Sequence, residues 1–189
     1  MGLIDTLEGC FPEALEALRA LPIRWDWERF SFWLRQDYPF VEALYRYQVG
    51  LLREAPQAHR APLAQALMVT VEELDWLLSQ GADPRAEVHP VRREYICLLE
   101  QMERLSYPYR LVFFYFLNRF FLEAWNAHVE GEGPWQELAE HWSAPEFQAV
   151  LFDLEVMAQG AAEELDQGVV VHYLGRILEM EGKTWSLLL

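Results

Sequence analysis

The chain has 189 residues, a length that suits one domain with a sizeable core. Hydrophobic residues make up 52% of it, including eight Trp, eight Tyr and eleven Phe, a composition that a disordered chain does not have. The formal net charge is −15, which excludes the basic footprint of a nucleic-acid binder or of a protein held on an anionic membrane surface. We therefore expect a single domain, residues 1–189, with no nucleic-acid or membrane partner.

Helical periodicity runs through almost the whole chain, because apolar residues recur three and four positions apart. The predicted helices cover, in chain order, about 11–20, 26–54, 60–79, 90–105, 109–129, 135–142, 145–164 and 168–187. Pro39 lies inside the second of these helices, where a lost backbone bond predicts a kink. The helix at 109–129 is apolar nearly all round and should lie at the centre. No strand pattern is visible, so the sequence predicts an all-α bundle of seven or eight helices.

Three acidic residues fall on the apolar faces of three different helices. Asp37 lies within the stretch FSFWLRQDYPFVEALYRYQVGLL (30–52), between Trp33 and Phe40 on the predicted buried stripe. Glu123 has the same setting near the end of the central helix, and Glu181 near the end of the last one. A buried carboxylate is costly unless it is paired or hydrogen-bonded, so each of these acids needs an explanation.

Two explanations of the three acids remain open. Each could be satisfied locally, Asp37 by a tyrosine hydroxyl, Glu123 by Arg119, and Glu181 by Lys183 or solvent. Alternatively, the acids converge in an aromatic-lined cavity, which suits a cationic or amino-bearing heteroaromatic ligand. Burial would then raise their pKa values toward the range useful for general acid–base chemistry.

The sequence gives no sign of a metal or cofactor site. Cys10 and Cys97 lie in no Cys/His pattern, and we expect reduced, buried thiols in a cytoplasmic protein. No histidine has a partner at metal-ligand spacing, and no phosphate-binding or dinucleotide-binding motif is present. The first residues do not have the pattern of a signal peptide. We therefore expect no metal and no cofactor.

Four stretches of the chain carry a resemblance to a known family. They are residues 30–52 quoted above, HPVRREYICLLEQM (89–102), FLNRFFLEAW (116–125) and EGKTW (181–185). They resemble the conserved segments of the TenA-type proteins, named for thiaminase II, which have a heme-oxygenase-like helical fold without binding heme. The resemblance covers nearly the whole chain and implies that fold here.

The resemblance also implies a set of binding residues. In the family, the acid that follows a glutamine holds the amino group of a substituted pyrimidine, and Asp37 matches it. Tyr95 matches one of the tyrosines that clasp the ring, whereas Phe40 and Phe121 stand where others would be. Two aromatic residues complete the implied site, Trp142 as a further wall and Trp185 beside the closing glutamate.

The catalytic residues that the resemblance implies depend on the branch of the family. The best known branch has a cysteine on the central helix, where this chain has Leu117. A second branch lacks this cysteine and is thought to use paired glutamates. By that likeness Glu181, which matches the closing glutamate, is one catalytic acid, and Glu123 is the candidate for the second.

Three functions follow as alternatives. The first is a carboxylate-dependent hydrolase of aminopyrimidine products of thiamin breakdown. The second is a catalytically inactive protein that binds a small pyrimidine-like or other aromatic molecule, or regulates through it, because Leu117, Phe40 and Phe121 make the site apolar. The third, from the wider fold, is a metal-dependent oxidase. The family also implies a homodimer or homotetramer.

Overall fold

The computed structural model describes residue 6 and residues 9–129 and 132–189. This part of the chain folds into eight α-helices and a final 3-10 helix, with no strand. The helices are α2 (Pro12–Arg19), α3 (Trp27–Glu54), α4 (Gln57–Ser79), α5 (Pro90–Met102), α6 (Tyr107–His128), α7 (Pro134–Ser143), α8 (Pro145–Ala162) and α9 (Gln167–Trp185), followed by η1 (Ser186–Leu188). The all-α, multi-helix bundle predicted from periodicity is therefore confirmed.

Local sequence signals set the helix ends. The Asp26 carboxylate accepts a hydrogen bond from the Arg29 N–H (2.8 Å) and caps α3, and Asp166 caps α9 in the same way. Proline occupies the first turn of α5 and of α6, where a missing N–H costs nothing. Helix α6 begins at Tyr107, two residues before the predicted start. Pro108 lies in its first turn and therefore does not break the helix.

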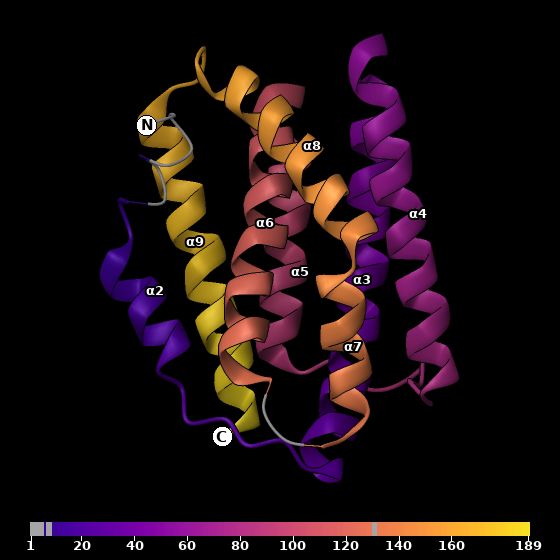
Figure 1. Ribbon diagram of the computed structural model, residues 1–189. Coiled ribbons are helices and arrows are strands. Elements are labelled where there is room, and N and C mark those ends of the chain that lie inside the picture. The colour runs from indigo at the N-terminus through magenta and orange to yellow at the C-terminus, as the bar shows by residue number, and fades with distance from the viewer. Residues whose placement is uncertain (1–5, 7–8, 130–131) are drawn as a thin grey trace.

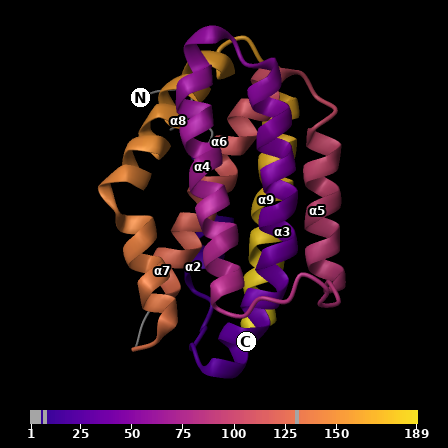
Figure 2. The ribbon, with the colours of Figure 1, turned by 90° about the vertical axis from the view of Figure 1, so that its right-hand side faces the viewer.

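The central position predicted for the most apolar helix is confirmed. Helix α6 packs against α2, α3, α5, α7, α8 and α9. In Figure 1 it lies between α9 and α8, and Figure 2 shows α3 and α4 side by side on one face of the bundle. Long helix α3 continues through Pro39 and packs on α4, α5 and α6. The functional candidates on α3, α4, α5 and α9 therefore all reach the interior around α6.

The two cysteines differ from the expectation, and the described helices give no sign of a membrane span. The thiols of Cys10 and Cys97 are free but exposed, so the prediction that they are buried was wrong. Cys97 lies between the buried stripes of α5 and points away from the core. Of the helices that the structure describes, none has both the length and the apolar character needed to cross a membrane.

Candidate functional site

Three carboxylates and one guanidinium meet inside the bundle. They come from four helices: Asp37 from α3, Glu73 from α4, Arg92 from α5 and Glu181 from α9. Their exposed fractions are 1%, 7%, 3% and 3% respectively, so all four are buried. Because isolated charges at such depth are very unfavourable, the partners of each group define what the site can do.

Asp37 is held by an internal ion pair. Its Oδ1 accepts a hydrogen bond from Nη2 of Arg92, whose guanidinium carbon lies 4.6 Å from the centre of the Phe40 ring. Burial raises the pKa of Asp37 to about 6, and the positive charge of Arg92 opposes that rise. The second oxygen, Oδ2, is buried and has no hydrogen-bond partner among the described residues. Asp37 therefore keeps one free acceptor.

The glutamine before Asp37 explains how Arg92 comes to this position. Gln36 is buried, its amide nitrogen donates to the carbonyl of Glu87 (3.1 Å), and its amide oxygen accepts from the N–H of His89 (2.7 Å). These two bonds fix the start of α5 against α3. Arg92, one turn further along α5, consequently meets the Asp37 carboxylate.

Glu181 has both of its oxygens occupied by donors. The Tyr95 hydroxyl donates to Oε1 (2.6 Å), and the Trp185 indole N–H donates to Oε2 (3.0 Å). Burial raises the pKa of Glu181, although both hydrogen bonds favour the charged form. The Tyr95 ring also packs on Phe40, with ring centres 4.5 Å apart. The Tyr95 hydroxyl and the Trp185 N–H thus orient Glu181.

Glu73 is a third buried carboxylate. It is not among the residues that the family resemblance implied. It has no hydrogen bond or ion pair with any residue that the structure describes. Burial raises its pKa well above the ordinary value, and the nearby Asp37 charge adds to the rise. Burial and the Asp37 charge thus both favour the protonated form of Glu73, whereas the positive charge of Arg92 opposes them.

A small cavity lies among these groups, with a volume of about 30 Å³. We call it the inner cavity. Its lining residues are Asp37, Phe40, Val41, Leu44, Glu73, Leu117, Asn118, Phe121, Trp142 and Glu181. The Phe121 ring lies edge-on to Trp142 (5.5 Å between centres) and also contacts Trp185 (6.2 Å). This volume accommodates one or two water molecules and is too small for an aromatic ring.

Most of the residues that the resemblance implied lie together. Asp37, Phe40, Phe121, Trp142 and Glu181 line the inner cavity directly. Tyr95 and Trp185 act on it through their hydrogen bonds to Glu181, as described above. The convergence of aromatic rings and acids is thus present in the structure.

Glu123 lies elsewhere. It is not among the residues found to line the inner cavity, and its Oε1 pairs with Nη2 of Arg19 (2.9 Å) and, more weakly, with Arg119 (3.8 Å). Of the two expectations for Glu123, pairing with Arg119 is therefore the one the structure favours, with Arg19 from α2 as the closer partner.

The chemistry available in the inner cavity is that of carboxyl groups. Leu117 lines it on the central helix, and both cysteines are exposed elsewhere. Within the described residues no group of three or more His, Cys, Asp or Glu side chains is arranged to hold a metal ion. Neither a thiolate nucleophile nor a metal therefore has support from the described side chains.

Arg92 and Glu73 were missed at the level of sequence, although both carry a signal. Arg92 lies three residues before Tyr95 and seven before Leu99, on the buried stripe of α5. Glu73 continues a stripe on α4 that includes Ala66 and Thr70, which is weak because these residues are small or polar. The test that identified Asp37, a charged residue on a buried stripe, would have identified Arg92, whereas the weak stripe around Glu73 gives little contrast.

A helical bundle with an internal acidic site is the class of protein that these features define. Solved structures of the same fold are known. The TenA homologue of Pyrococcus furiosus has a TM-score of 0.79 at 21% identity, over 98% of this chain and 95% of that one. The TenA homologue of Pyrococcus horikoshii OT3 has a TM-score of 0.87 at 12% identity, over 100% and 98%. A protein from Sulfolobus solfataricus P2, described as a candidate TenA-like thiaminase, has a TM-score of 0.80 at 12% identity, over 98% and 95%.

These likenesses show the fold of the chain. It has the heme-oxygenase-like all-α fold of the TenA homologues, and the resemblance predicted from the sequence is confirmed at that level. No protein-family model matches the chain, and no curated protein matches it. The function must therefore be argued from the site.

Proposed function

We propose that the inner cavity binds a small, flat, amino-bearing heteroaromatic molecule of the aminopyrimidine class. The observation that carries this proposal is the free Oδ2 of Asp37, a buried acceptor on the cavity wall with no partner among the described residues. An amino N–H of the ligand would satisfy it, and an unsatisfied buried acceptor costs about 1–3 kcal/mol. Phe40, Phe121 and Trp142 supply the aromatic faces on which a flat ring packs.

Binding of a ring requires side chains around the inner cavity to move. A volume of about 30 Å³ has room for water but not for a pyrimidine ring. Glu73 lines the inner cavity and also the larger hollow outside it. Movement of this unpartnered side chain is the simplest way to open a path, because it breaks no hydrogen bond. The proposal therefore includes opening of the site on binding.

Titration calorimetry with matched ligands tests the binding step. We expect hydroxymethyl-aminopyrimidine and aminomethyl-aminopyrimidine to bind, and the same pyrimidines without the ring amino group to bind about tenfold or more weakly. Asp37→Asn should remove this preference, whereas Asp75→Asn, an exposed acid of α4, should leave it unchanged. Equal affinity for ligands with and without the amino group would contradict the role of Asp37.

The reaction that we propose for this site is hydrolysis of a C–N bond on the aminopyrimidine side chain. Water forms the new C–O bond, the C–N bond breaks, and the departing nitrogen leaves as ammonia or an amine after gaining a proton. Glu181 lies at the cavity, is oriented by Tyr95 and Trp185, and has a raised pKa, which suits a group that removes a proton from water. Glu73 lines the inner cavity, whereas Glu123 is not among its lining residues, so Glu73 is the better candidate for the second carboxyl group.

Release of ammonia from aminomethyl-aminopyrimidine tests the reaction. Glu181→Gln should lower turnover by about 100-fold or more while binding is kept, since general acid–base catalysis contributes about that much. Glu179→Gln is the matched control, because Glu179 lies on the same helix and pairs with Lys183 at the surface. Unchanged turnover in Glu181→Gln would exclude the catalytic role.

A second candidate function, binding without catalysis, has its own support. Both oxygens of Glu181 already accept hydrogen bonds, and Arg92 already neutralises Asp37. Phe40, Leu117 and Phe121 make much of the wall apolar. If calorimetry shows binding and no ammonia is released by the unaltered protein, the binding function is the correct one.

We also propose that the chain forms a homodimer or homotetramer, as the resemblance implies. Size-exclusion chromatography with light scattering tests it directly. A mass of one chain at micromolar concentration would contradict it.

A further inference from the structure

A second, larger hollow lies outside the inner cavity, between α4 and α7. Its volume is about 360 Å³, within the range of small-molecule sites. We call it the outer hollow, and its described lining residues are Glu72, Glu73, Trp76, Glu137 and Leu138. Helix α4 packs on α3 and α8, while α7 packs on α6 and α8. The two helices thus form opposite walls.

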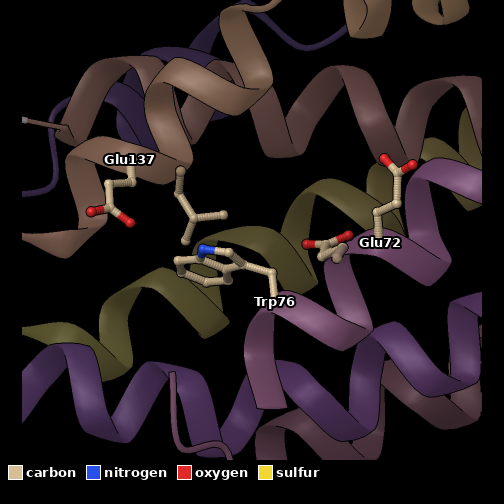
Figure 3. A pocket seen from close by; sticks show the side chains of 5 residues that line it. Glu72, Trp76 and Glu137 are labelled. Carbon is tan, nitrogen blue, oxygen red and sulfur yellow. The ribbon is translucent and has the colours of Figure 1, made fainter. Parts of the chain in front are cut away.

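The lining combines an aromatic face with negative charge. In Figure 3 the Trp76 indole lies between Glu137 of α7 on one side and Glu72 of α4 on the other. Glu72 and Glu137 are exposed, whereas Trp76 is half-buried. None of the described lining residues is basic, so the chain supplies no counter-ion from this wall. Such a combination attracts cations, because an indole face and carboxylates both carry negative potential.

Glu73 adds an independent observation. It is 7% exposed, lines the outer hollow, and has no hydrogen bond or ion pair with the described part of the chain. A buried carboxyl group without a partner is costly to maintain. A cationic ligand would favour the ionised form of Glu73 and would give it a partner at the inner end of the outer hollow.

The arrangement suits an organic cation better than a metal ion. The three glutamates of the outer hollow do not form a group that could hold a metal, judged over the described residues. The volume of about 360 Å³ also far exceeds the space that a bare ion needs. An organic ammonium ion can fill it, place its charge between separate carboxylates and lay its alkyl groups on the indole.

We propose that the outer hollow is a binding site for a small organic ammonium ion. The charged nitrogen lies over the Trp76 ring, with Glu137 and Glu72 at the rim and Glu73 at the inner end. Leu138 provides an apolar contact for the alkyl groups. The proposal does not rest on the aminopyrimidine function, since Glu72, Trp76, Glu137 and Leu138 do not line the inner cavity and only Glu73 belongs to both spaces.

The test uses cations and a neutral molecule of the same shape. Choline, tetramethylammonium and butane-1,4-diamine are titrated into the full chain, and 3,3-dimethylbutan-1-ol serves as the uncharged analogue of choline. The indole N–H resonance of Trp76, assigned with Trp76→Phe, reports occupation of the outer hollow. We expect at least one of the three cations to shift it with millimolar or tighter affinity and the alcohol to leave it unchanged.

Variants then locate the site. Because Trp76 variants lack the indole signal, their affinity is measured by titration calorimetry. Trp76→Leu should weaken binding of the cation about tenfold, and Trp76→Phe should restore most of it, because phenylalanine keeps an aromatic face. Trp27→Leu is the control, as Trp27 is an exposed tryptophan at the start of α3. Glu137→Gln should weaken binding without affecting the inner cavity, which it does not line.

Three results would overturn the proposal. The first is equal binding of the alcohol, which would make the outer hollow merely apolar. The second is displacement of the organic cation by millimolar magnesium or calcium, which would indicate a metal site. The third is no shift with any of the three cations. Each of these leaves the aminopyrimidine tests intact, because those use Asp37 and Glu181.

Discussion

The inner cavity and the outer hollow both contain carboxyl groups, but the chain treats them differently. In the inner cavity, Arg92 neutralises Asp37, and Tyr95 and Trp185 hydrogen-bond to Glu181. In the outer hollow, the carboxyl groups of Glu72, Glu73 and Glu137 surround a tryptophan without a described cation. The comparison teaches that the inner acids are built into the fold, whereas the outer acids are left available for a ligand.

The largest predicted effect concerns the internal ion pair. Arg92→Met should lower the free energy of unfolding by about 3–5 kcal/mol, because it leaves the Asp37 carboxylate buried without a partner. Urea unfolding followed by circular dichroism measures the loss. Arg93→Met, an exposed neighbour on α5, should cost little.

The double variant Asp37→Asn with Arg92→Met sharpens that prediction. Removing both charges should recover a large part of the lost stability, since the penalty comes from the unpaired charge. If the double variant is as unstable as Arg92→Met alone, packing of the arginine and not its charge carries the effect.

A second prediction concerns the size of the inner cavity. Leu117→Ala should cost about 2–5 kcal/mol of stability, as expected for a buried leucine. It should also tighten aminopyrimidine binding by about tenfold, because the site no longer has to open as far. Leu111→Ala, a buried leucine of α6 that is not among the cavity-lining residues, should cost similar stability without the gain in affinity.

A charged residue of the site could be predicted from the sequence only where the other residues on the same helix face are clearly apolar. Asp37 and Glu181 interrupt strongly apolar stripes, and each was placed correctly in the interior. Glu73 interrupts a stripe of small and polar residues, so the same test gave no contrast there. The positions of the helices were predictable to within a few residues because apolar residues recur with the 3.6-residue helical period along most of the chain.

The pairing of the acids could not be predicted, for a physical reason. Periodicity fixes which face of a helix a residue occupies, but not which residue of another helix it meets. Arg92 of α5 pairs with Asp37 of α3, and the neighbouring Gln36 hydrogen-bonds to the backbone just before α5. Glu123 pairs with Arg19 of α2, 104 positions away in the chain. Both facts depend on contacts between segments distant in the chain.

A third prediction uses pH to separate Glu73 from its exposed neighbour. Because the folded-state pKa of Glu73 is raised, the folded chain binds its proton more tightly than the unfolded chain does. Its effect on stability is therefore absent at about pH 3, well below the unfolded pKa, and becomes increasingly unfavourable as the pH rises above the unfolded pKa. The raised pKa values of Asp37 and Glu181 act in the same direction.

Glu73→Gln should therefore raise stability at about pH 8 by on the order of 1 kcal/mol, or about 2–4 °C in melting temperature. The gain should disappear at about pH 3, where the glutamate is protonated in both states. Thermal melts across this range measure it. Glu72→Gln, one position away and exposed, should show no such pH dependence, and a similar gain in that variant would contradict the role of burial.

The smallest predicted effect concerns Glu123 and completes the contrast between built-in and surface acids. Its carboxylate pairs with Arg19, whose side chain is 44% exposed, so solvent screens the interaction. Glu123→Gln should change stability by about 0–1 kcal/mol and leave aminopyrimidine binding and ammonia release unchanged. If Glu123→Gln abolished turnover as Glu181→Gln is expected to do, Glu123 would have to reach the inner cavity in the liganded state, which requires α6 to rotate and break the pair with Arg19. Added salt separates the two cases, because screening weakens a surface pair at Glu123 but has little effect on the buried hydrogen bonds of Glu181.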